Sequence, residues 1–365
     1  MRVLIAGGGT GGHVIPALAI ARELRDGHGA DVRFVGTARG LETKLVPEAG
    51  FPLELIRVGQ LKNVSLMTRV RTLFDLPLGL MRCMELLRSF RPDVVMGVGG
   101  YASGPAMMAA IMLRIPTLAF EPNAVPGLAN RLVGRWVTAA AVNFEETRRY
   151  FRGVKVTGIP VRAEFFAVGT KAPPSDASPQ SLHLLVFGGS QGARVFNDVM
   201  PTIARELLEG VPGLTILHQA GARFGKATEE AYMTRGAEPS RWQVAEFLDD
   251  MPKRFEDADL ILCRSGASTV AELAAAGRAS VLVPFPGAAD DHQLRNAEVF
   301  AAAGAATLRV QAADELMAGF LLNDLSGLLL NSGRRAEMGS KVRELAHPNA
   351  AQEIGAMIVE LARRG

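Results

Sequence analysis

Two glycine-rich segments hold the residues best placed for chemistry, because each lies between a strand-length apolar run and a helix-patterned segment. The first reads Gly-Gly-Gly-Thr-Gly-Gly-His at 7–13, and the second reads Gly-Gly-Ser-Gln-Gly-Ala-Arg at 188–194. A turn from strand to helix directs several backbone N–H groups at one point, and the helix dipole adds positive potential there. Two such turns predict two α/β domains that face each other across a cleft and bind a phosphate-bearing ligand between them.

The first turn carries two side chains that could take part in a reaction, Thr10 and His13. The positive end of a helix dipole favours the neutral imidazole, which can act as a base. A structural hydrogen bond at the helix start is the alternative role for His13. The turn also matches the dinucleotide-binding fingerprint, but the second strand ends at Thr37 without the carboxylate that would hold a ribose, which disfavours a dehydrogenase.

The second half offers three further candidates. The turn at 188–194 lacks the lysine of a P-loop, which disfavours ATP hydrolysis. Ser190 and its neighbouring N–H groups could still hold a diphosphate, and a tight turn needed only for packing is the alternative, which the recurrence of such a turn weakens. Glu272, early in a helix of small residues, could accept two hydrogen bonds from ribose hydroxyls or serve only as a charge at the helix start. The cluster Asp-Asp-His-Gln at 290–293 has no metal-ligand spacing, so Gln293 and Asn296 are interpreted as sugar or phosphate ligands and no metal is expected.

The elements that must position these residues follow from alternating apolar runs and helix-period segments, a pattern typical of parallel sheets covered by helices. Strands are expected in the first half at 3–6, 32–36, 53–58, 94–98, 117–120, 137–142 and 154–157. In the second half they are expected at 184–187, 214–218, 243–245, 260–263, 280–283 and 306–308. Each half also has a second glycine turn, at 97–104 and at 264–268, and turns at the carboxyl ends of parallel strands are where ligands bind.

A segment rich in proline, serine and alanine at 168–181 has no apolar period and is interpreted as a linker. The predicted domains are 1–163 and 164–348, both Rossmann-like. The helix-patterned end at 349–365 could pack on either domain, and we list it with the first.

Composition excludes several classes of protein. The net charge of +3 and the pI of about 9.0 suit an anionic substrate or membrane surface but are too small to indicate a nucleic-acid partner. The two cysteines, Cys83 and Cys263, cannot form a disulfide framework or a metal knuckle, which favours a reducing compartment. No apolar run reaches the roughly 18 residues that would span a bilayer, so a cytoplasmic or membrane-surface protein is expected.

The segment 66–90 combines a helical apolar stripe with more arginines than carboxylates. A wide apolar face with arginines suits an anionic membrane surface, and a core helix kinked at Pro77 is the alternative. The apolar residues assigned to the membrane surface are Leu66, Val70, Leu73, Phe74, Leu80, Met81 and Met84.

Eight short motifs, in order, carry a resemblance to a known family. They are Gly-Gly-Thr-Gly-Gly-His-Val at 8–14, Gly-Gly-Tyr-Ala-Ser-Gly-Pro at 99–105, Glu-Pro-Asn-Ala-Val-Pro-Gly at 121–127, Pro-Val-Arg at 160–162, the second glycine turn at 188–194, Glu-Phe-Leu-Asp-Asp-Met at 246–251, Cys-Arg-Ser-Gly-Ala at 263–267 and Asp-Asp-His-Gln at 290–293. With these motifs the chain resembles the MurG family of N-acetylglucosaminyltransferases of peptidoglycan synthesis.

The resemblance implies a GT-B fold and an inverting hexosyltransferase. It would move N-acetylglucosamine from UDP-N-acetylglucosamine to the C4 hydroxyl of the muramyl sugar of lipid I, giving lipid II and UDP through a β(1→4) linkage. No cofactor is implied. The enzyme would be peripheral on the cytoplasmic face of the inner membrane, with its first domain facing acceptor and membrane. Other cell-wall synthesis proteins would be further partners.

The resemblance also assigns roles to residues. His13 is the first choice for the base or the acceptor-orienting residue, and Glu121 is the second. Donor contacts carry over to Thr10, Gly11, Gly12, Asn123, Arg162, Ser190, Phe247, Leu248, Arg264, Ala267, Glu272 and Gln293. Acceptor contacts carry over to Gly9, Gly99, Gly100, Tyr101, Ser103 and Gly104.

The chain departs from the family pattern at four positions. Phe120, Pro122, Ile159 and Gly287 stand where the family usually has histidine, glutamine, asparagine and, in many members, histidine. Two other functions stay open: a UDP-N-acetylglucosamine 2-epimerase, which needs no lipid, and a non-catalytic nucleotide-sugar sensor. The apolar stripe at 66–90 speaks against the epimerase.

Overall fold

The computed structural model describes residues 1–56, 66–169 and 181–364, with the backbone alone for 66–76. Two compact units are present, 1–161 with 349–365, and 162–348. The boundary lies two residues before the expected one, and most of the predicted linker, 170–180, lies outside the described residues.

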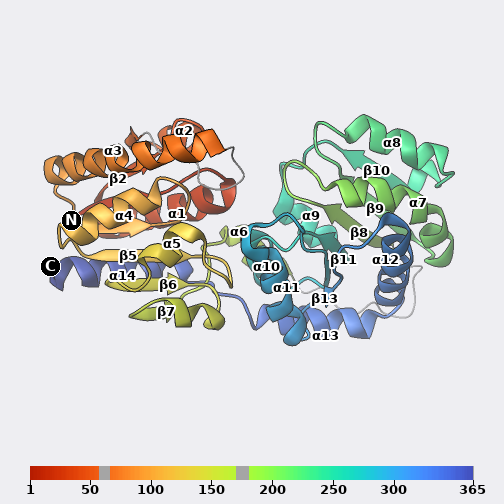
Figure 1. The fold of residues 1–365 in the computed structure, drawn as a ribbon. Coiled ribbons are helices and arrows are strands. Elements are labelled where there is room, and N and C mark those ends of the chain that lie inside the picture. The colour runs from red at the N-terminus through yellow and green to blue at the C-terminus, as the bar shows by residue number, and fades with distance from the viewer. Residues whose placement is uncertain (57–65, 170–180, 365) are drawn as a thin grey trace. The chain divides into compact units, whose positions relative to one another are not determined.

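The described residues of the first unit form a seven-stranded parallel sheet in the order β3-β2-β1-β4-β5-β6-β7 (Figure 1). The strands are β1 Arg2–Ala6, β2 Asp31–Gly36, β3 Leu53–Leu55, β4 Val94–Gly97, β5 Thr117–Glu121, β6 Ala139–Val142 and β7 Val154–Val156. The helices are α1 Gly11–His28, α2 Glu42–Glu48, α3 Leu66–Phe90, α4 Ser103–Met112, α5 Leu128–Val133 and α14 Ala350–Arg364, with the 3-10 turn η1 Glu145–Tyr150. The seven expected strands are confirmed, with shifts of up to three residues at their ends.

In the second unit, residues 162–169 and 181–348 are described, and they repeat the design with a six-stranded parallel sheet in the order β10-β9-β8-β11-β12-β13. Its strands are β8 Leu182–Phe187, β9 Leu214–Gln219, β10 Trp242–Ala245, β11 Leu260–Cys263, β12 Ser280–Leu282 and β13 Thr307–Leu308. Its helices are α6 Ala163–Phe166, α7 Arg194–Gly210, α8 Gly225–Thr234, α9 Met251–Asp257, α10 Ala267–Ala276, α11 His292–Ala302, α12 Asp314–Leu329 and α13 Ser332–Arg343, with 3-10 turns η2 Pro239–Arg241 and η3 Ala289–Asp291. The expected α/β class with two Rossmann-like sheets is confirmed.

The C-terminal helix α14 returns to the first unit, so both ends of the chain lie on that unit (Figure 1). Ile354 and Ile358 are fully buried, and Gly355 lies close to Glu23 of α1. Glu353 forms an ion pair of 2.8 Å with Lys155 of β7. Burial of an apolar helix face is what holds α14, because this exposed ion pair adds little.

Helix α3 packs part of its surface against the hydrophobic core and exposes another part to solvent. Cys83 and Leu87 are buried against α4 and the sheet, whereas Met81 is 52% exposed. Leu80 and Met84 were expected at a membrane surface, but they pack against the core cluster, because a helix that covers a sheet must bury one stripe. The side chains of Leu66, Val70, Leu73 and Phe74 lie outside the described ones.

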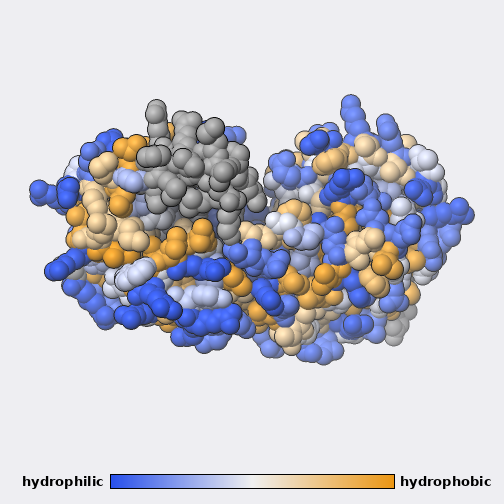
Figure 2. Space-filling model, viewed as in Figure 1, coloured by the Kyte–Doolittle hydropathy of each residue, from blue (hydrophilic) through white to orange (hydrophobic). Residues whose placement is uncertain are grey.

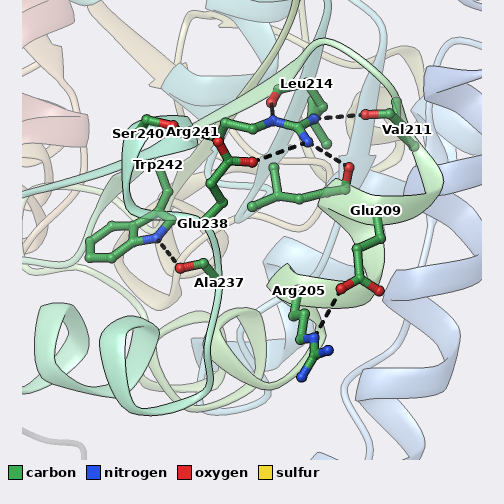
Figure 3. A network of polar contacts seen from close by, with 10 residues as sticks. Arg205, Glu209, Val211, Leu214, Ala237, Glu238, Ser240, Arg241 and Trp242 are labelled. Atoms are coloured by element: carbon green, nitrogen blue, oxygen red, sulfur yellow. Dashed lines mark hydrogen bonds and ion pairs between the residues drawn. The ribbon is translucent and has the colours of Figure 1, made fainter.

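Arginine side chains close the C-terminal ends of several helices in the second unit. Arg241 donates from Nη1 to the Leu208 carbonyl, from Nη2 to Val211 and from Nε to Leu214, each at 2.9 Å (Figure 3). The last carbonyls of a helix have no partner within the helix, and a guanidinium has five donors to offer them. Buried Arg278 does the same for α9 through the Phe255 carbonyl, at 2.7 Å.

We expect Arg241→Ala to lower the free energy of unfolding of the second unit by roughly 2–3 kcal/mol, because three carbonyls each lose one hydrogen-bond donor. In a Trp136→Phe background Trp242 is the single tryptophan, so its fluorescence during urea unfolding reports this unit. Arg205→Ala, which breaks only an exposed 2.9 Å pair with Glu209 on α7 (Figure 3), is the control and should change little. Equal losses in the two variants would contradict the capping role.

Candidate active site

The two glycine turns of the first unit interlock at the carboxyl ends of adjacent strands β1 and β4. The Gly8 N–H donates to the Gly99 carbonyl at 3.4 Å. A Cβ on Gly7 would lie 2.3 Å from the Gly99 oxygen, and a Cβ on Gly100 would lie 2.4 Å from the Gly8 oxygen. Glycine is required here because the two backbones touch, and Gly99 and Gly100 also have φ of 90° and 82°.

His13 lies against the second of these turns. A Cβ on Gly99 would be 2.9 Å from His13 Cε1, so the missing side chain makes room for the imidazole. Tyr101, in the same turn, is 43% exposed, and Ser103 is buried at the start of α4. The first-choice base and the turn assigned to the acceptor are therefore brought together within one unit.

The buried carboxylate of Glu42, which the sequence analysis did not single out, binds the backbone of the first glycine turn. Glu42 of α2 is 1% exposed, and its Oε2 accepts from the Gly9 N–H at 2.7 Å. Its Oε1 accepts from the N–H of Thr37 at 3.0 Å and from the hydroxyl of Thr37 at 3.1 Å. The N–H of Gly9 is thus bound within the protein, whereas those of Gly11 and Gly12, in the first turn of α1, have no acceptor within the helix.

Glu121 ends β5 with a carboxylate that is 2% exposed. Its Oε1 accepts from the N–H and Nδ2 of Asn123 at 3.0 and 3.2 Å, and its Oε2 accepts from the Gly127 N–H at 3.1 Å and from Asn130 Nδ2 at 2.9 Å. Burial raises the pKa of Glu121, and these four donors oppose that shift. The geometry suits a residue that holds Asn123 in position better than one that receives a proton from a substrate.

In the second unit, the glycine turn after β8 interlocks with the turn after β9. A Cβ on Gly192 would lie 1.9 Å from the Ala220 oxygen, and a Cβ on Gly221 would lie 2.2 Å from the Gln191 oxygen. Ser190 is exposed at the crest of the turn, and α7 begins at Arg194. The N–H groups of Arg194 and Val195, the first two residues of α7, have no acceptor within the helix, which makes this end attractive to an anion.

A cavity of about 550 Å³ opens beside this turn. Lining residues named from the sequence are Gly188, Gly192, Ala193 and Arg194 of the glycine turn, together with Arg264 and Gln293. The sequence did not single out the other lining residues, Val195, Asp198, Phe285, Gln311 and Asp314. Ser190, Phe247, Leu248, Ala267, Glu272 and Arg162 belong to the same unit but do not line the cavity, and Thr10, Gly11, Gly12 and Asn123 belong to the first unit.

Arg264 is a buried cation in the wall of the cavity. It donates from Nη1 to the carbonyls of Val283 at 3.1 Å and Pro284 at 2.9 Å, and its guanidinium is 5.4 Å from the ring centres of both Phe196 and Phe285. Burial lowers its pKa to about 10, which leaves it charged at neutral pH. It therefore supplies positive potential to the cavity.

Gln293 has a fixed orientation. Its Oε1 accepts from the Phe285 N–H at 3.0 Å, and its own carbonyl accepts from the Ser265 hydroxyl at 2.8 Å. The Nε2 group is its other hydrogen-bonding end, so the residue is oriented as a donor. Asp290 and Asp291, just before it, have left-handed φ values of 53°. In the described part of the chain no group of three His, Cys, Asp or Glu side chains is arranged to hold a metal.

The departures from the family pattern fit their surroundings. Phe120 and Ile159 are buried in apolar cores, and the Pro122 carbonyl accepts from Asn143 Nδ2 at 3.2 Å. A Cβ on Gly287 would lie 2.7 Å from the ring of Phe285. A larger residue there would displace that ring from the cavity wall.

Glu272 of α10 is partly buried, and burial raises its pKa to about 7, while the charge of Arg162 opposes the shift. The folded chain then binds a proton that the unfolded chain, with its usual value near 4.5, has already released. Stability from this group is full below pH 4.5 and is lost as the pH rises through 7.

We therefore expect the free energy of unfolding of the wild type to fall between pH 5 and pH 8 relative to Glu272→Gln, by at most about 3 kcal/mol. Urea unfolding at several pH values, followed by Trp242 fluorescence with all variants in the Trp136→Phe background, measures the difference. Glu298→Gln, on the exposed face of α11, serves as the control. Parallel curves for wild type and Glu272→Gln would contradict the shift.

Comparisons with known proteins agree along the whole chain. Residues 3–142 match the glycosyltransferase family 28 N-terminal domain, and residues 183–354 match the glycosyltransferase family 28 C-terminal domain. The UDP-N-acetylglucosamine--N-acetylmuramyl-(pentapeptide) pyrophosphoryl-undecaprenol N-acetylglucosamine transferase of Anaeromyxobacter sp. (strain Fw109-5) is 44% identical, covering 100% of this chain and 94% of that protein. The protein of the same name from Shewanella sp. (strain ANA-3) is 40% identical, covering 100% and 98%.

Solved structures extend the comparison. The crystal structure of Acinetobacter baumannii MurG has a TM-score of 0.83 and 33% identity, covering 98% of this chain and 99% of that one. The UDP-GlcNAc 2-epimerase of Neisseria meningitidis, bound to UDP-GlcNAc, has a TM-score of 0.67 at 15% identity, covering 100% of both chains, which shows a shared fold alone. This chain therefore belongs to glycosyltransferase family 28 and, within it, to the MurG N-acetylglucosaminyltransferases of peptidoglycan synthesis.

Proposed function

We propose that this chain transfers N-acetylglucosamine from UDP-N-acetylglucosamine to the C4 hydroxyl of the muramyl sugar of lipid I, releasing UDP and forming lipid II. The observation that carries the proposal is the full-length match, at 44% identity, to a relative named for this transfer. Neither the epimerase nor the sensor alternative has a relative at comparable identity among the comparisons above.

The second unit is proposed to bind the donor. The cavity combines a buried arginine, Arg264, with the first turn of α7 and with the donor end of Gln293, which is a set of groups suited to a diphosphate and a sugar. Glu272 would accept from the ribose hydroxyls, and Phe247, which is 56% exposed, would border the uracil.

The first unit is proposed to bind the acceptor. The N–H groups of Gly11 and Gly12 and the turn at 99–104 would face its diphosphate, and His13 would take the proton of the attacking C4 hydroxyl. The oxygen then forms a bond to the sugar C1 from the face opposite UDP, which leaves with the electron pair of the broken C1–O bond and inverts C1. Helix N-termini and turn amides can stabilise the leaving diphosphate, so the proposal requires no metal or cofactor.

The first test is UDP release from UDP-N-acetylglucosamine with and without a short-chain lipid I analogue, followed by mass analysis. We expect His13→Ala to lower kcat by about 100-fold or more with donor affinity nearly unchanged, because only proton transfer is lost. His28→Ala, at the other end of α1, is the matched control. Release without acceptor would favour the epimerase, and donor binding without turnover would favour the sensor.

Glu121→Gln separates the two candidates for the base. If Glu121 positions Asn123, the glutamine keeps part of its bonds and lowers kcat much less than His13→Ala does. A loss as large as that of His13→Ala, with the thermal unfolding temperature unchanged, would move the role of base to Glu121.

We further propose that the exposed side of α3, α4 and α5 rests on an anionic bilayer at the cytoplasmic face of the inner membrane. Its exposed apolar residues are Leu78, Met81, Met112, Leu132 and Trp136, and Figure 2 shows apolar residues gathered over α4 and α5. Exposed arginines accompany them, namely Arg82, Arg114, Arg131 and Arg135. Apolar area together with arginines favours anionic lipid. Among the described residues no helix is long and apolar enough to cross a membrane.

We expect Leu132→Glu with Trp136→Glu to weaken co-sedimentation with phosphatidylglycerol vesicles by about tenfold or more, since two large apolar side chains no longer enter the interface. Leu330→Glu, at a residue 63% exposed on the second unit, is the matched control and should bind as the wild type does. An equal loss in both variants, or no loss in the first, would contradict this surface.

A further inference from the structure

One buried amide joins two segments of the second unit that are far apart in sequence. Gln219 is the last residue of β9 and is paired in register with Phe187 of β8 on one side and Ala245 of β10 on the other. Its side chain is 3% exposed. Nε2 donates to the Gly189 carbonyl at 2.8 Å, and Oε1 accepts from the Leu248 N–H at 3.1 Å.

The two bonds reach the loops on either side of β9. Gly189 belongs to the glycine turn after β8 and directly precedes exposed Ser190. Leu248 is 8% exposed and follows Phe247, which is 56% exposed after β10. The Gln219 side chain thus binds one backbone group in each loop. The side chains next to these groups, Ser190 and Phe247, are exposed to solvent.

The amide fixes the spacing of these loops because both of its ends are committed. A buried glutamine that lost either partner would leave an unpaired polar atom, which costs about 1–3 kcal/mol, so the side chain has little freedom to rotate. The backbone contact of Gly192 with Ala220 holds the turn at another point but does not reach the Phe247–Leu248 segment.

We propose that Gln219 is a positioning residue for a nucleoside diphosphate. It sets the distance between the turn that would hold the phosphates and the segment that would border the base, so that one rigid ligand engages both. This inference rests on the proposed donor site in the second unit. The affinity for a ligand that has only the base or only the diphosphate does not depend on the distance between the two loops. The affinity for UDP does, because UDP has both parts.

The test compares three probes, UDP, uridine and inorganic diphosphate, by calorimetric titration of the full chain. We expect Gln219→Met, which keeps the side-chain volume and removes both bonds, to weaken UDP binding at least tenfold. Uridine and diphosphate should change less than threefold. In the transfer assay, KM for the donor should rise while kcat at saturating donor is largely kept.

Asn197→Ala is the matched control. Asn197 Nδ2 donates at 3.0 Å to the Ala220 carbonyl, so the substitution removes a buried hydrogen bond of a side-chain amide. That hydrogen bond does not connect the Gly189 turn to the Phe247–Leu248 segment. The control variant should lower the unfolding temperature about as much as Gln219→Met and leave the preference for UDP over its fragments intact. An equal loss of that preference in the control would overturn the proposal.

Gln219→Glu tests the same idea if Gln219→Met does not fold. A protonated glutamic acid can donate to the Gly189 carbonyl and accept from the Leu248 N–H, whereas a carboxylate cannot donate. Affinity for UDP-N-acetylglucosamine, relative to wild type at each pH, should therefore be near normal at pH 5 and weakened at pH 8.

Two results would overturn this inference while leaving the proposed donor site intact. One is a ratio of Gln219→Glu affinity to wild-type affinity that does not change with pH, and the other is unchanged UDP affinity in Gln219→Met. A wild-type chain that binds no UDP would overturn the proposed donor site as well.

Discussion

Backbone touches backbone at the carboxyl ends of the parallel strands, and this contact organises both units. Gly7, Gly8, Gly99 and Gly100 allow the turns after β1 and β4 to interlock, and Gly192 and Gly221 do the same after β8 and β9. A methyl group at most of these positions would lie about 2 Å from a carbonyl oxygen. Because the turns are locked, the helix N-termini that follow them point their N–H groups in fixed directions, as electrostatic stabilisation of a leaving diphosphate requires.

The turns are also held from below by buried polar side chains at strand ends or just beyond them. Glu42 supports the first turn, Glu121 supports the loop of Asn123, and Gln219 spans two loops of the second unit. Each satisfies backbone groups that a turn would otherwise leave unpaired in the interior. Both oxygens of Glu42 and of Glu121 accept hydrogen bonds from the protein, so burial of an acid near a proposed active site is not by itself a sign that it moves a proton.

The second unit adds a different use of charge. Arg241, Arg278 and Arg264 donate to carbonyls at the ends of helices and strands, so part of their hydrogen-bonding capacity is used within the protein. Arg264 alone of these three also lines the cavity. A guanidinium with five donors can bind protein carbonyls with one edge and still present positive potential to a ligand.

The sequence by itself determined the class of fold, because alternating apolar runs and helix periods admit few arrangements other than parallel sheets. It also marked the glycine turns, His13, Arg264 and Gln293, since turn chemistry and motif spacing are local properties. It missed Glu42 and Gln219, while its choice of Glu121 as the second candidate for the base stays a prediction. The contacts of Glu42 and Gln219 join segments about 30 residues apart, and they exist only because β2 lies beside β1 and β9 lies between β8 and β10. Whether Leu80 and Met84 face a membrane or the core was likewise decided by how α3 packs. The sequence of an amphipathic helix shows that it has an apolar stripe, but not whether protein or lipid covers that stripe.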